Sequence, residues 1–420
     1  MKKRLITLLV ILFMSSQSFA AGFGLYEFGA RASALGGATV ARAWDASTVF
    51  YNPAGLSFIE GTHFYGGVTL ISPENHFVGA EPILTGQEHS AKDQIFNPIG
   101  IYLTHRFSDK FAAGIGVTNP FGLGLEWEED FPGRGIARNT DLQSFYISPV
   151  VSYKVMDNLS VGGGLDLVYS NVLLERSAYL FESEGSSGYE VGTSKLEGSS
   201  GIGIGFSASL MYQTERLGLG FLYRHSVTNE FEEGDATFEI YDTYASPLAS
   251  QLLTDQKAST EMTYPNFFSV GVYYRILDAL GVEVDFMWYN WSVFDELVLD
   301  FKDDRLDQVV PENYEDASQL RVGVHYDVTS ALQIRAGYIY DQTPQPIESV
   351  SPLLPDNDRN DYSIGLGYTY NNLQFDLGYM LVDFGERSTV EDGEGQNEYG
   401  FDGTYSSLAN LFFFSFGIGL

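Results

Sequence analysis

Most of this chain alternates between apolar and polar or small residues with a period of two. In one clear segment the first face carries only apolar residues and glycine, at positions 159, 161, 163, 165, 167 and 169. The other face carries Ser160, Gly162, Gly164, Asp166 and Ser170. Residues 320–328 and 373–381 repeat the pattern. A period of two with one apolar face predicts strands that lie between two different environments.

The connections between these segments alternate strictly in length. Six are tight and polar, at 108–110, 156–158, 214–216, 277–279, 329–330 and 371–372. Seven are long and mostly acidic, at 73–95, 121–139, 177–199, 231–262, 303–316, 342–360 and 388–405. A soluble sandwich would also alternate along its strands, but seven hairpins joined by short turns on one side are typical of an outer-membrane barrel. We therefore predict an all-β fold, in which residues 61–420 form a 14-stranded antiparallel transmembrane β-barrel.

The last predicted strand runs to the carboxyl terminus with one apolar face. That face consists of Phe412, Phe414, Phe416, Ile418 and Leu420. Outer-membrane barrels commonly end on such a strand, usually with an aromatic residue, whereas this chain ends on Leu420. The pattern supports a strand that faces lipid.

The first twenty residues have the plan of a secretory signal peptide. Lys2, Lys3 and Arg4 precede an apolar run over 5–14, and 18–20 reads Ser-Phe-Ala, a small-x-small cleavage site. A run of ten is too short for a membrane helix, which needs roughly 20 residues. We expect cleavage after Ala20 and, with the barrel, location in the outer membrane of a Gram-negative bacterium.

The composition excludes several classes of partner. Fifty-five Asp and Glu against 23 Lys and Arg give a net charge of −32, which disfavours nucleic acid because its phosphates would be repelled. The chain has no Cys, so disulfides and thiolate metal sites are excluded. We expect no cofactor and no metal site.

Residues 21–60 lack the alternation and are rich in Gly and Ala. This segment closes on the sequence YNPAGL at 51–56. We predict that it is an N-terminal hatch that plugs the barrel lumen, with a short helix over Ser33 to Trp44. Arg31, Arg42 and Asp45 would pair with inward charges, and Pro53 and Gly55 would form the turn into the first strand.

If the apolar faces point to lipid, the opposite faces line the lumen. The charged residues assigned inward are Arg176, Arg224, Arg321, Arg335, Asp166, Glu283, Asp285, His325, Asp327 and Asp376. Charges that face lipid cost roughly 2–4 kcal/mol each near the midplane, so inward is favoured. They either pair across the lumen, or an Arg binds the carboxylate of an amphipathic ligand, for which Arg176 and Arg321 are the candidates.

Glycines also recur at the inward positions 162, 164, 203, 205, 218, 220, 323, 337, 365 and 367. They either make room for a plug or ligand, or relieve crowding in a curved sheet.

Two further stretches are candidate sites. Asn119 and Pro120 follow the third predicted strand, and because Pro cannot donate to the ladder, they either end the strand or break the wall. Phe181, Phe231 and Phe238 lie in long loops and either line an outer ligand groove or pack the loops and rim.

Several motifs together resemble the FadL-like family of outer-membrane transporters for long-chain fatty acids and aromatic hydrocarbons. They are AGFGLYEFGARASALGGA from Ala21, YNPAGL, NPFGLGLEW from Asn119 followed by Gly133-Arg134, SPVVSYKVMDNLSVGGGLDLVYS from Ser148, ERLGLGFLYR from Glu215, LRVGVHYDV from Leu320, LQIRAGYIYDQTPQP from Leu332 and LLPDNDRNDYSIGLGY from Leu353. The ordered set covers essentially the whole chain after residue 20.

The resemblance implies a hatch-closed barrel whose third strand has a kink that opens sideways. Ligand would bind between outer loops, enter a lumen pocket, and leave laterally into the membrane after the hatch end shifts. The moving end would be at Ala21, Gly22 and Phe23. Asn52, Pro53, Ala54 and Gly55 would form its fixed turn.

The predicted function is passive, non-enzymatic uptake of hydrophobic compounds, most simply long-chain fatty acids, with aromatic or aliphatic hydrocarbons as the alternative. A general porin needs no hatch, and an outer-membrane lipase needs a nucleophile and base, yet no GxSxG occurs and the six His show no paired spacing. An adhesin barrel is a third class. The expected partners are the ligand, outer-membrane lipid with lipopolysaccharide, and the barrel assembly machinery, for a protein that acts as a monomer.

Overall fold

The computed structural model describes residues 22–81, 84, 86–180, 188–241 and 246–420. The predicted signal peptide, Ala21 and Phe181 lie outside these residues. Within the described part, no helix is long and apolar enough to cross a membrane.

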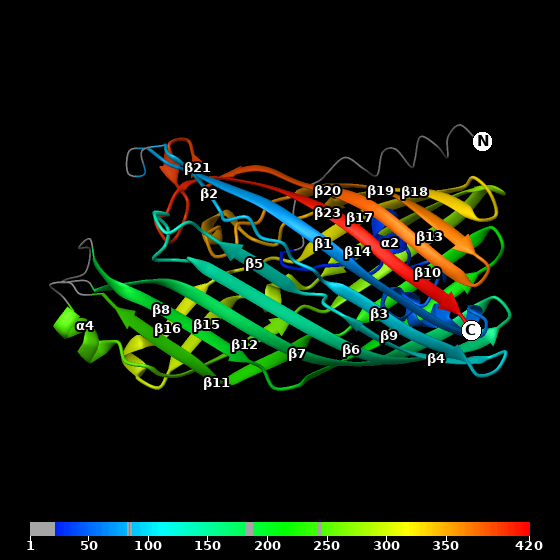
Figure 1. Ribbon diagram of the computed structural model, residues 1–420, viewed down its shortest axis with the longest axis horizontal. Helices are drawn as coiled ribbons and strands as arrows, with labels where there is room; N and C mark the ends of the chain where they lie inside the picture. The colour runs from blue at the N-terminus through cyan, green and yellow to red at the C-terminus, as the bar shows by residue number, and fades with distance from the viewer. Residues whose placement is uncertain (1–21, 82–83, 85, 181–187, 242–245) are drawn as a thin grey trace.

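Fourteen antiparallel strands close into a barrel, as the sequence predicts (Figure 1). In order around the wall they are β1 (Thr62–Gly79), β3 (Ile99–Arg106), β4 (Phe111–Thr118), β6 (Asn139–Met156), β7 (Leu159–Leu180), β9 (Gly203–Gln213), β10 (Leu217–Arg224), β13 (Phe267–Leu277), β14 (Leu280–Tyr289), β17 (Ala317–Asp327), β18 (Leu332–Asp341), β19 (Arg359–Tyr370), β20 (Leu373–Ser388) and β23 (Gly403–Gly419). The last strand pairs with the first from His63↔Gly419 to Gly79↔Gly403, so the wall has no free edge.

All six predicted tight turns join neighbouring wall strands, at the end of the barrel where the chain also terminates (Figure 1). The long connections lie at the other end and carry further structure. The strands within these connections are β2 (Glu88–Ser90), β5 (Gly122–Glu126), β8 (Tyr189–Ser199), β11 (Val227–Ile240), β12 (Gln256–Tyr264), β15 (Glu296–Phe301), β16 (Gln308–Pro311), β21 (Val390–Glu391) and β22 (Glu394–Gly395). The helices within these connections are α4 (Ser246–Leu252) and the 3-10 turns η2 (Trp291–Val293), η3 (Asp304–Leu306) and η4 (Ile347–Ser349).

The predicted start of the fifth long connection is wrong. The fifth long connection begins at Asn290 rather than at residue 303, because β14 ends at Tyr289. Trp291 then turns inward and is fully buried, and β15 pairs with β12 through Ala258↔Phe301 instead of continuing the wall. An apolar strand outside the wall has the same alternation as one inside it, so the pattern could not separate the two.

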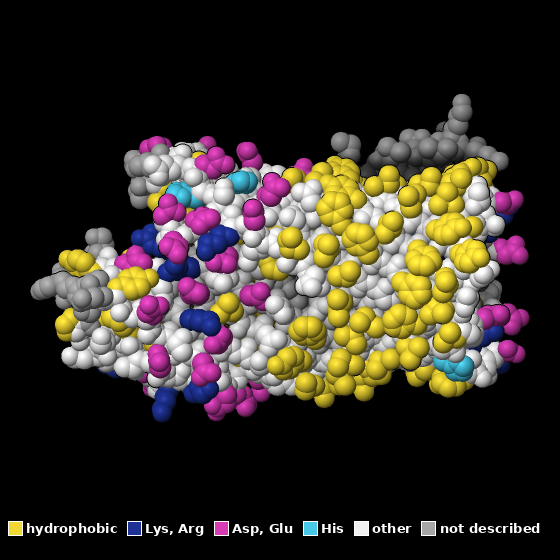
Figure 2. Space-filling view, viewed as in Figure 1, with side chains coloured by type: hydrophobic (Ala, Val, Ile, Leu, Met, Phe, Trp, Pro, Cys, Tyr) yellow, Lys and Arg dark blue, Asp and Glu magenta, His cyan; other side chains and the backbone are white. Residues whose placement is uncertain are grey.

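The outward face of the wall is apolar over the half of the barrel nearest the tight turns. Phe412 and Phe414 in β23 are 48% and 45% exposed, while Phe413 between them is fully buried. Figure 2 shows the hydrophobic side chains gathered in a band over this half, with most charged side chains beyond it. The predicted lipid-facing last strand is confirmed.

The inward charges predicted from the sequence largely pair with one another. Arg224 Nη1 lies 3.1 Å from Asp166 Oδ1, and Arg335 Nη1 lies 2.6 Å from Asp376 Oδ1, with all four side chains almost fully buried. Buried charges are tolerated when they are paired and hydrogen-bonded. Asp327, which is partly exposed near the tight-turn end, lies 3.7 Å from His325. Glu283 and Asp285 instead accept the N–H groups of Ala41 and Val40 in the hatch, at 2.6 and 3.0 Å.

Residues 22–60 lie inside the barrel and form the hatch. It contains α2 (Ala30–Ala34), α3 (Thr48–Tyr51) and the 3-10 helix η1 (Pro53–Phe58). The predicted helix over 33–44 is wrong: α2 starts earlier and stops before Gly36 and Gly37, whose φ angles are 61° and 68°. The Gly37 N–H donates to Ala32 O at 2.8 Å, a helix ending that glycine in the left-handed region favours.

Most of the inward glycines make room for the hatch. A Cβ added at Gly220 would lie 2.0 Å from Val40 O, and one at Gly218 would lie 2.3 Å from Ala41 O. The same holds for positions 162, 323, 337 and 365. Positions 164 and 367 face other wall residues, and positions 203 and 205 face Val227 of β11. Small residues therefore line the wall where the hatch backbone touches it.

Candidate functional site

One wall strand is interrupted beside the hatch. β4 ends at Thr118, opposite Tyr146 of β6, and β5 resumes at Gly122, opposite Gln143. The chain between them is Asn119, Pro120 and Phe121. Both segments pair with the same neighbour, β6, so the ladder is interrupted at these three residues, and we call this interruption the break.

Side chains replace the missing ladder bonds at this break. Asn119 Oδ1 accepts the Ile99 N–H at 3.0 Å, and Asn119 Nδ2 donates to Ser144 O at 2.8 Å. The Phe121 N–H donates to Ser144 Oγ at 3.0 Å, and the same hydroxyl donates to Phe121 O at 2.6 Å. The break is therefore a defined conformation with its polar groups satisfied.

The first described residues of the hatch pair with the break. The Leu25 N–H donates to Pro120 O at 2.8 Å, and the Gly122 N–H donates to Phe23 O at 3.0 Å. Gly24 and Phe121 form an antiparallel bridge. The hatch end thus acts as a short added strand on the interrupted wall.

Gly22, just before this bridge, is held by a loop. Its N–H donates to Asp356 Oδ2 at 3.2 Å, and the same oxygen accepts the Thr343 hydroxyl at 2.7 Å. Burial raises the pKa of Asp356 to about 6. The moving end expected from the sequence is therefore tied to both wall and loop.

A cavity of about 450 Å³ adjoins the break, and we call it the inner cavity. Its apolar lining includes Phe23, Leu25, Phe96, Phe121, Leu125 and Leu411. Its polar lining includes Glu27, Asp356 and Arg359. A volume in this range suits a ligand of moderate size.

Arg359 was not singled out from the sequence. Its Nη2 donates to Asp341 Oδ2 at 2.7 Å, and its guanidinium lies 5.2 Å from the Phe384 ring centroid. Its Nε has no partner within the described residues. Because Arg359 stands at the junction of a long loop and a strand, the sequence pattern assigns it no face.

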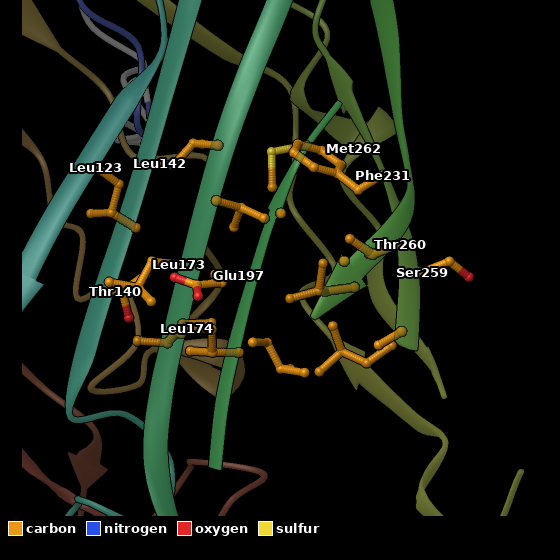
Figure 3. Close-up of a pocket in the computed structure, with 18 of the residues that line it drawn as sticks. Leu123, Thr140, Leu142, Leu173, Leu174, Glu197, Phe231, Ser259, Thr260 and Met262 are labelled. Carbon is orange, nitrogen blue, oxygen red and sulfur yellow. The ribbon is translucent and has the colours of Figure 1, made fainter. Parts of the chain in front are cut away.

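A second cavity of about 90 Å³ lies farther out, among the loop strands (Figure 3). We call it the outer cavity. Its apolar lining includes Leu123, Leu142, Leu174, Phe231, Met262 and Leu299. Phe23, Leu123, Leu142 and Leu354 line both cavities, so the two adjoin at the hatch end.

Phe23 stands at the junction of the cavities within an aromatic cluster. Its ring centroid lies 4.7 Å from Trp291, 5.5 Å from Phe294 and 6.1 Å from Phe121, all with edge-to-face geometry. Phe121 in turn stacks on Tyr264 at 4.7 Å. Phe23 therefore links the hatch end to the loop residues Trp291 and Phe294 where the two cavities adjoin.

The predicted ligand residues fall in different places. Phe231 lines the outer cavity, while Phe238 packs behind it against a cluster that contains Leu174. Arg176 lines neither cavity; its Nη2 donates to Gln308 Oε1 at 2.5 Å.

Arg321 also lines neither of these cavities and instead contacts the hatch. It donates to Gly37 O at 3.4 Å, and its guanidinium lies 4.2 Å from the Tyr26 ring centroid. It also donates to Gln319 through its Nε at 2.9 Å.

The NPAG turn is anchored on three wall strands. Asn52 Nδ2 donates to Leu210 O at 3.1 Å, and the Ala54 N–H donates to Ser209 Oγ at 2.9 Å. Ala54 O accepts the hydroxyls of Ser152 at 2.7 Å and Ser160 at 2.6 Å. Pro53 and Gly55 complete this buried turn.

Comparisons with known proteins agree with this architecture. The family described as outer membrane protein transport protein (OMPP1/FadL/TodX) matches residues 11–418. The chain is 26% identical over 418 residues to the long-chain fatty acid transport protein of Escherichia coli O6:H1, covering 93% of this chain and 92% of that protein. It is 27% identical over 393 residues to outer membrane protein P1 of Haemophilus influenzae, covering 83% of each.

Solved structures show the same fold. A FadL homologue of Pseudomonas aeruginosa superposes with a TM-score of 0.82 at 21% identity, covering 95% of this chain and 100% of that one. The toluene transporter TodX of Pseudomonas putida gives 0.73 at 16% identity, covering 94% and 99%. This chain therefore belongs to the FadL/TodX family of bacterial outer-membrane proteins, which are non-enzymatic transporters of hydrophobic compounds.

Proposed function

We propose that this protein takes up long-chain fatty acids passively. Ligand is captured at the outer end, binds in the outer and inner cavities, and leaves sideways through the break at 119–121 when residues 22–25 move. The observation that carries the proposal is the pairing of Phe23 and Leu25 with Pro120 and Gly122 beside a 450 Å³ apolar cavity. A single displacement of the hatch end would open the inner cavity and unpair the wall at 119–121 at the same time.

A lateral exit is also favoured energetically. A chain of about fifteen methylenes gains roughly 0.8 kcal/mol per buried group, so release into periplasmic water would cost on the order of 12 kcal/mol. Transfer from an apolar cavity into lipid avoids most of this cost. The relatives named as long-chain fatty acid transport proteins support fatty acids as ligand.

Uptake of aromatic or aliphatic hydrocarbons is the second candidate. Two observations favour it: the outer cavity has no basic side chain in its described lining, and one structural relative is named a toluene transporter. Neither Arg176 nor Arg321 lines the two cavities, so the carboxylate site expected at these residues has no support from the cavity geometry.

Uptake by cells tests the proposal. Cells that make this protein should accumulate radiolabelled oleate faster than matched cells without it, with radiolabelled naphthalene measured in parallel. Equal oleate rates in the two strains would contradict fatty acid transport, and acceleration of naphthalene alone would assign the hydrocarbon function instead.

Conductance separates the transporter from a porin. The purified protein should show little steady ion current in a planar bilayer because the hatch fills the lumen. A variant that lacks residues 22–29 should conduct more. A large steady current from the intact protein would identify an open porin.

A further inference from the structure

The outer cavity is acidic as well as apolar. Glu197, Asp235 and Glu312 lie in its lining, and no Lys, Arg or His does among the residues that the structure describes. Glu197 and Asp235 are exposed to solvent, whereas Glu312 is only 2% exposed. Glu312 is thus the one buried acid that borders this space.

The backbone holds Glu312 in place. It follows β16 directly, and its N–H donates to Asp295 O at 2.8 Å. The N–H of Asn313 donates to the same oxygen at 2.8 Å, with Asn313 in the left-handed region at φ 51°. Because these two hydrogen bonds to the Asp295 carbonyl close the turn, they fix the backbone position of Glu312.

The carboxyl group of Glu312 is unpaired within the part of the chain that the structure describes. Across the described residues, its side chain makes no hydrogen bond and no ion pair. Burial alone raises the pKa of Glu312 to about 8, so the group is un-ionised near neutral pH. The phenols of Tyr314 and Tyr399 are its titratable neighbours, and their pKa values rise in part because of its charge.

From this geometry we propose that Glu312 selects ligands of the outer cavity by their head group. The cavity binds uncharged molecules that carry a hydrogen-bond-accepting oxygen on an apolar chain, such as alcohols, ketones, esters and un-ionised fatty acids. The Glu312 hydroxyl donates to that oxygen, as a carboxylic acid kept neutral by an apolar site can. This inference rests on the proposed function and adds that a ligand enters the outer cavity in its uncharged form.

Charged head groups fit this site poorly. A carboxylate anion would find no cation in the described lining, and the nearby Lys195 and Lys257 are already paired with Glu197 and Asp235 at 2.6 and 2.8 Å. An unpaired buried charge is costly. An alkylammonium ion would pair with Glu312 only after the carboxyl had released its proton to water, and both members of the resulting buried pair would lose their hydration. An uncharged oxygen avoids both costs and can accept a hydrogen bond from the Glu312 carboxyl, which is unpaired among the described residues.

The volume agrees with a head-group site. At about 90 Å³ the outer cavity is smaller than the roughly 150 Å³ cavity that accommodates benzene, so it holds a head group and the first few carbons. The remaining chain would pass Phe23 into the inner cavity, whose lining adjoins it.

Four ligands of equal chain length test the inference: dodecane, dodecan-2-one, dodecanoate and dodecylamine. Each radiolabelled ligand is partitioned between nanodiscs that contain the full barrel and empty nanodiscs, at about pH 6.5, where dodecanoate is ionised. The variants are Glu312→Gln, which keeps a donor without a titrating proton, and Glu312→Leu, which removes the donor. Glu315→Gln, three residues away and exposed, is the control.

Wild type and Glu315→Gln should bind dodecan-2-one about tenfold tighter than dodecane, the value of one satisfied buried hydrogen bond. Dodecanoate should bind more weakly than the ketone. Glu312→Leu should abolish the preference for the ketone over dodecane, while Glu312→Gln should keep it. At about pH 9.5 wild type should lose the preference because its carboxyl is then ionised and no longer donates, and Glu312→Gln should not.

Three results would overturn the inference: a ketone preference that survives in Glu312→Leu, dodecanoate as the tightest ligand of wild type, or dodecylamine as the tightest ligand with that affinity lost in Glu312→Gln. Failure of the proposed function looks different, because then no member of the series, dodecane included, would prefer barrel-containing nanodiscs.

Discussion

At the scale of single residues, the buried polar groups divide into two kinds. Arg335 is paired with Asp376, which lies two strands away in the wall. Arg321, Glu312 and Asp356 instead contact the hatch or border a cavity. Residues of the second kind are where a substitution should change transport.

The buried carboxyl of Glu312 predicts a pH dependence of stability. In the unfolded chain a glutamate ionises near its ordinary pKa, whereas in the native state Glu312 keeps its proton to about pH 8. Between these values the native state binds one more proton, so the free energy of unfolding falls as pH rises, by about 1.4 kcal/mol per pH unit at most.

Urea unfolding in detergent micelles measures this dependence. The Glu312→Gln variant should gain stability relative to wild type as pH rises from about 5 to 8, and the gain should level off above the native pKa. Parallel stability profiles for the two proteins would show that Glu312 is not un-ionised in the native state.

Arg321 makes a different prediction, because its contacts are with Gly37 and Tyr26 of the hatch. Arg321→Met should weaken the hatch attachment by about 1–3 kcal/mol and raise the steady ion current through the barrel. The measurement is conductance in a planar bilayer, with Arg176→Met as the control. If Arg321→Met abolishes oleate binding and leaves conductance unchanged, Arg321 is a ligand site and not a hatch contact.

At the scale of elements, the break between β4 and β5 depends on Asn119. Its side chain accepts from Ile99 and donates to Ser144, so Asn119→Ala removes two partly buried hydrogen bonds of about 1 kcal/mol each. The amides of Leu25 and Gly122, which pair hatch with wall, should then exchange with solvent faster, by roughly ten- to thirty-fold.

Hydrogen exchange read out by mass spectrometry measures this change. The control is Thr228→Ala, whose exposed hydroxyl bonds only to Thr263 across β11 and β12. If exchange at Leu25 and Gly122 is unchanged in Asn119→Ala, the pairing of the hatch end does not depend on the conformation of the break.

The elements also show what a sequence can and cannot predict. All six tight turns and the fourteen wall strands follow from the period of two, because lipid on one side and lumen on the other impose it on every wall strand. The hatch has no such constraint. Its helix α2 stops before Gly36 and Gly37, because the positive φ angles of these glycines end the helix whatever the apolar pattern.

The candidate site shows a similar contrast between residues that a local sequence signal identifies and residues that it does not. Proline at 120 pointed to the break because a missing N–H is a local property. Glu312 and Arg359 were not found, since both lie at the edges of long loops where no periodicity assigns a face. Their roles depend on segments distant in the chain, such as Asp295 and Asp341.

At the scale of the whole molecule, wall, hatch and outer strands meet at Phe23. It lines both cavities, and its carbonyl holds the interrupted wall strand. Ligand entry, hatch movement and wall opening are therefore expected to be one coupled step. A barrel that transports by this step should stop when the hatch end is tied to the wall.

A reversible disulfide between Gly24 and Phe121 tests this coupling most directly. The two form an antiparallel bridge, whose Cα separation of roughly 4.5–5.5 Å permits a disulfide, and the chain has no Cys of its own. The control is a disulfide between Ala113 and Val151, paired in the wall below the break. We predict that oxidised Gly24→Cys/Phe121→Cys protein transfers oleate into the membrane at least tenfold more slowly than the reduced form, while the control pair transfers equally in both states. Equal transfer by the locked and reduced hatch would contradict the account.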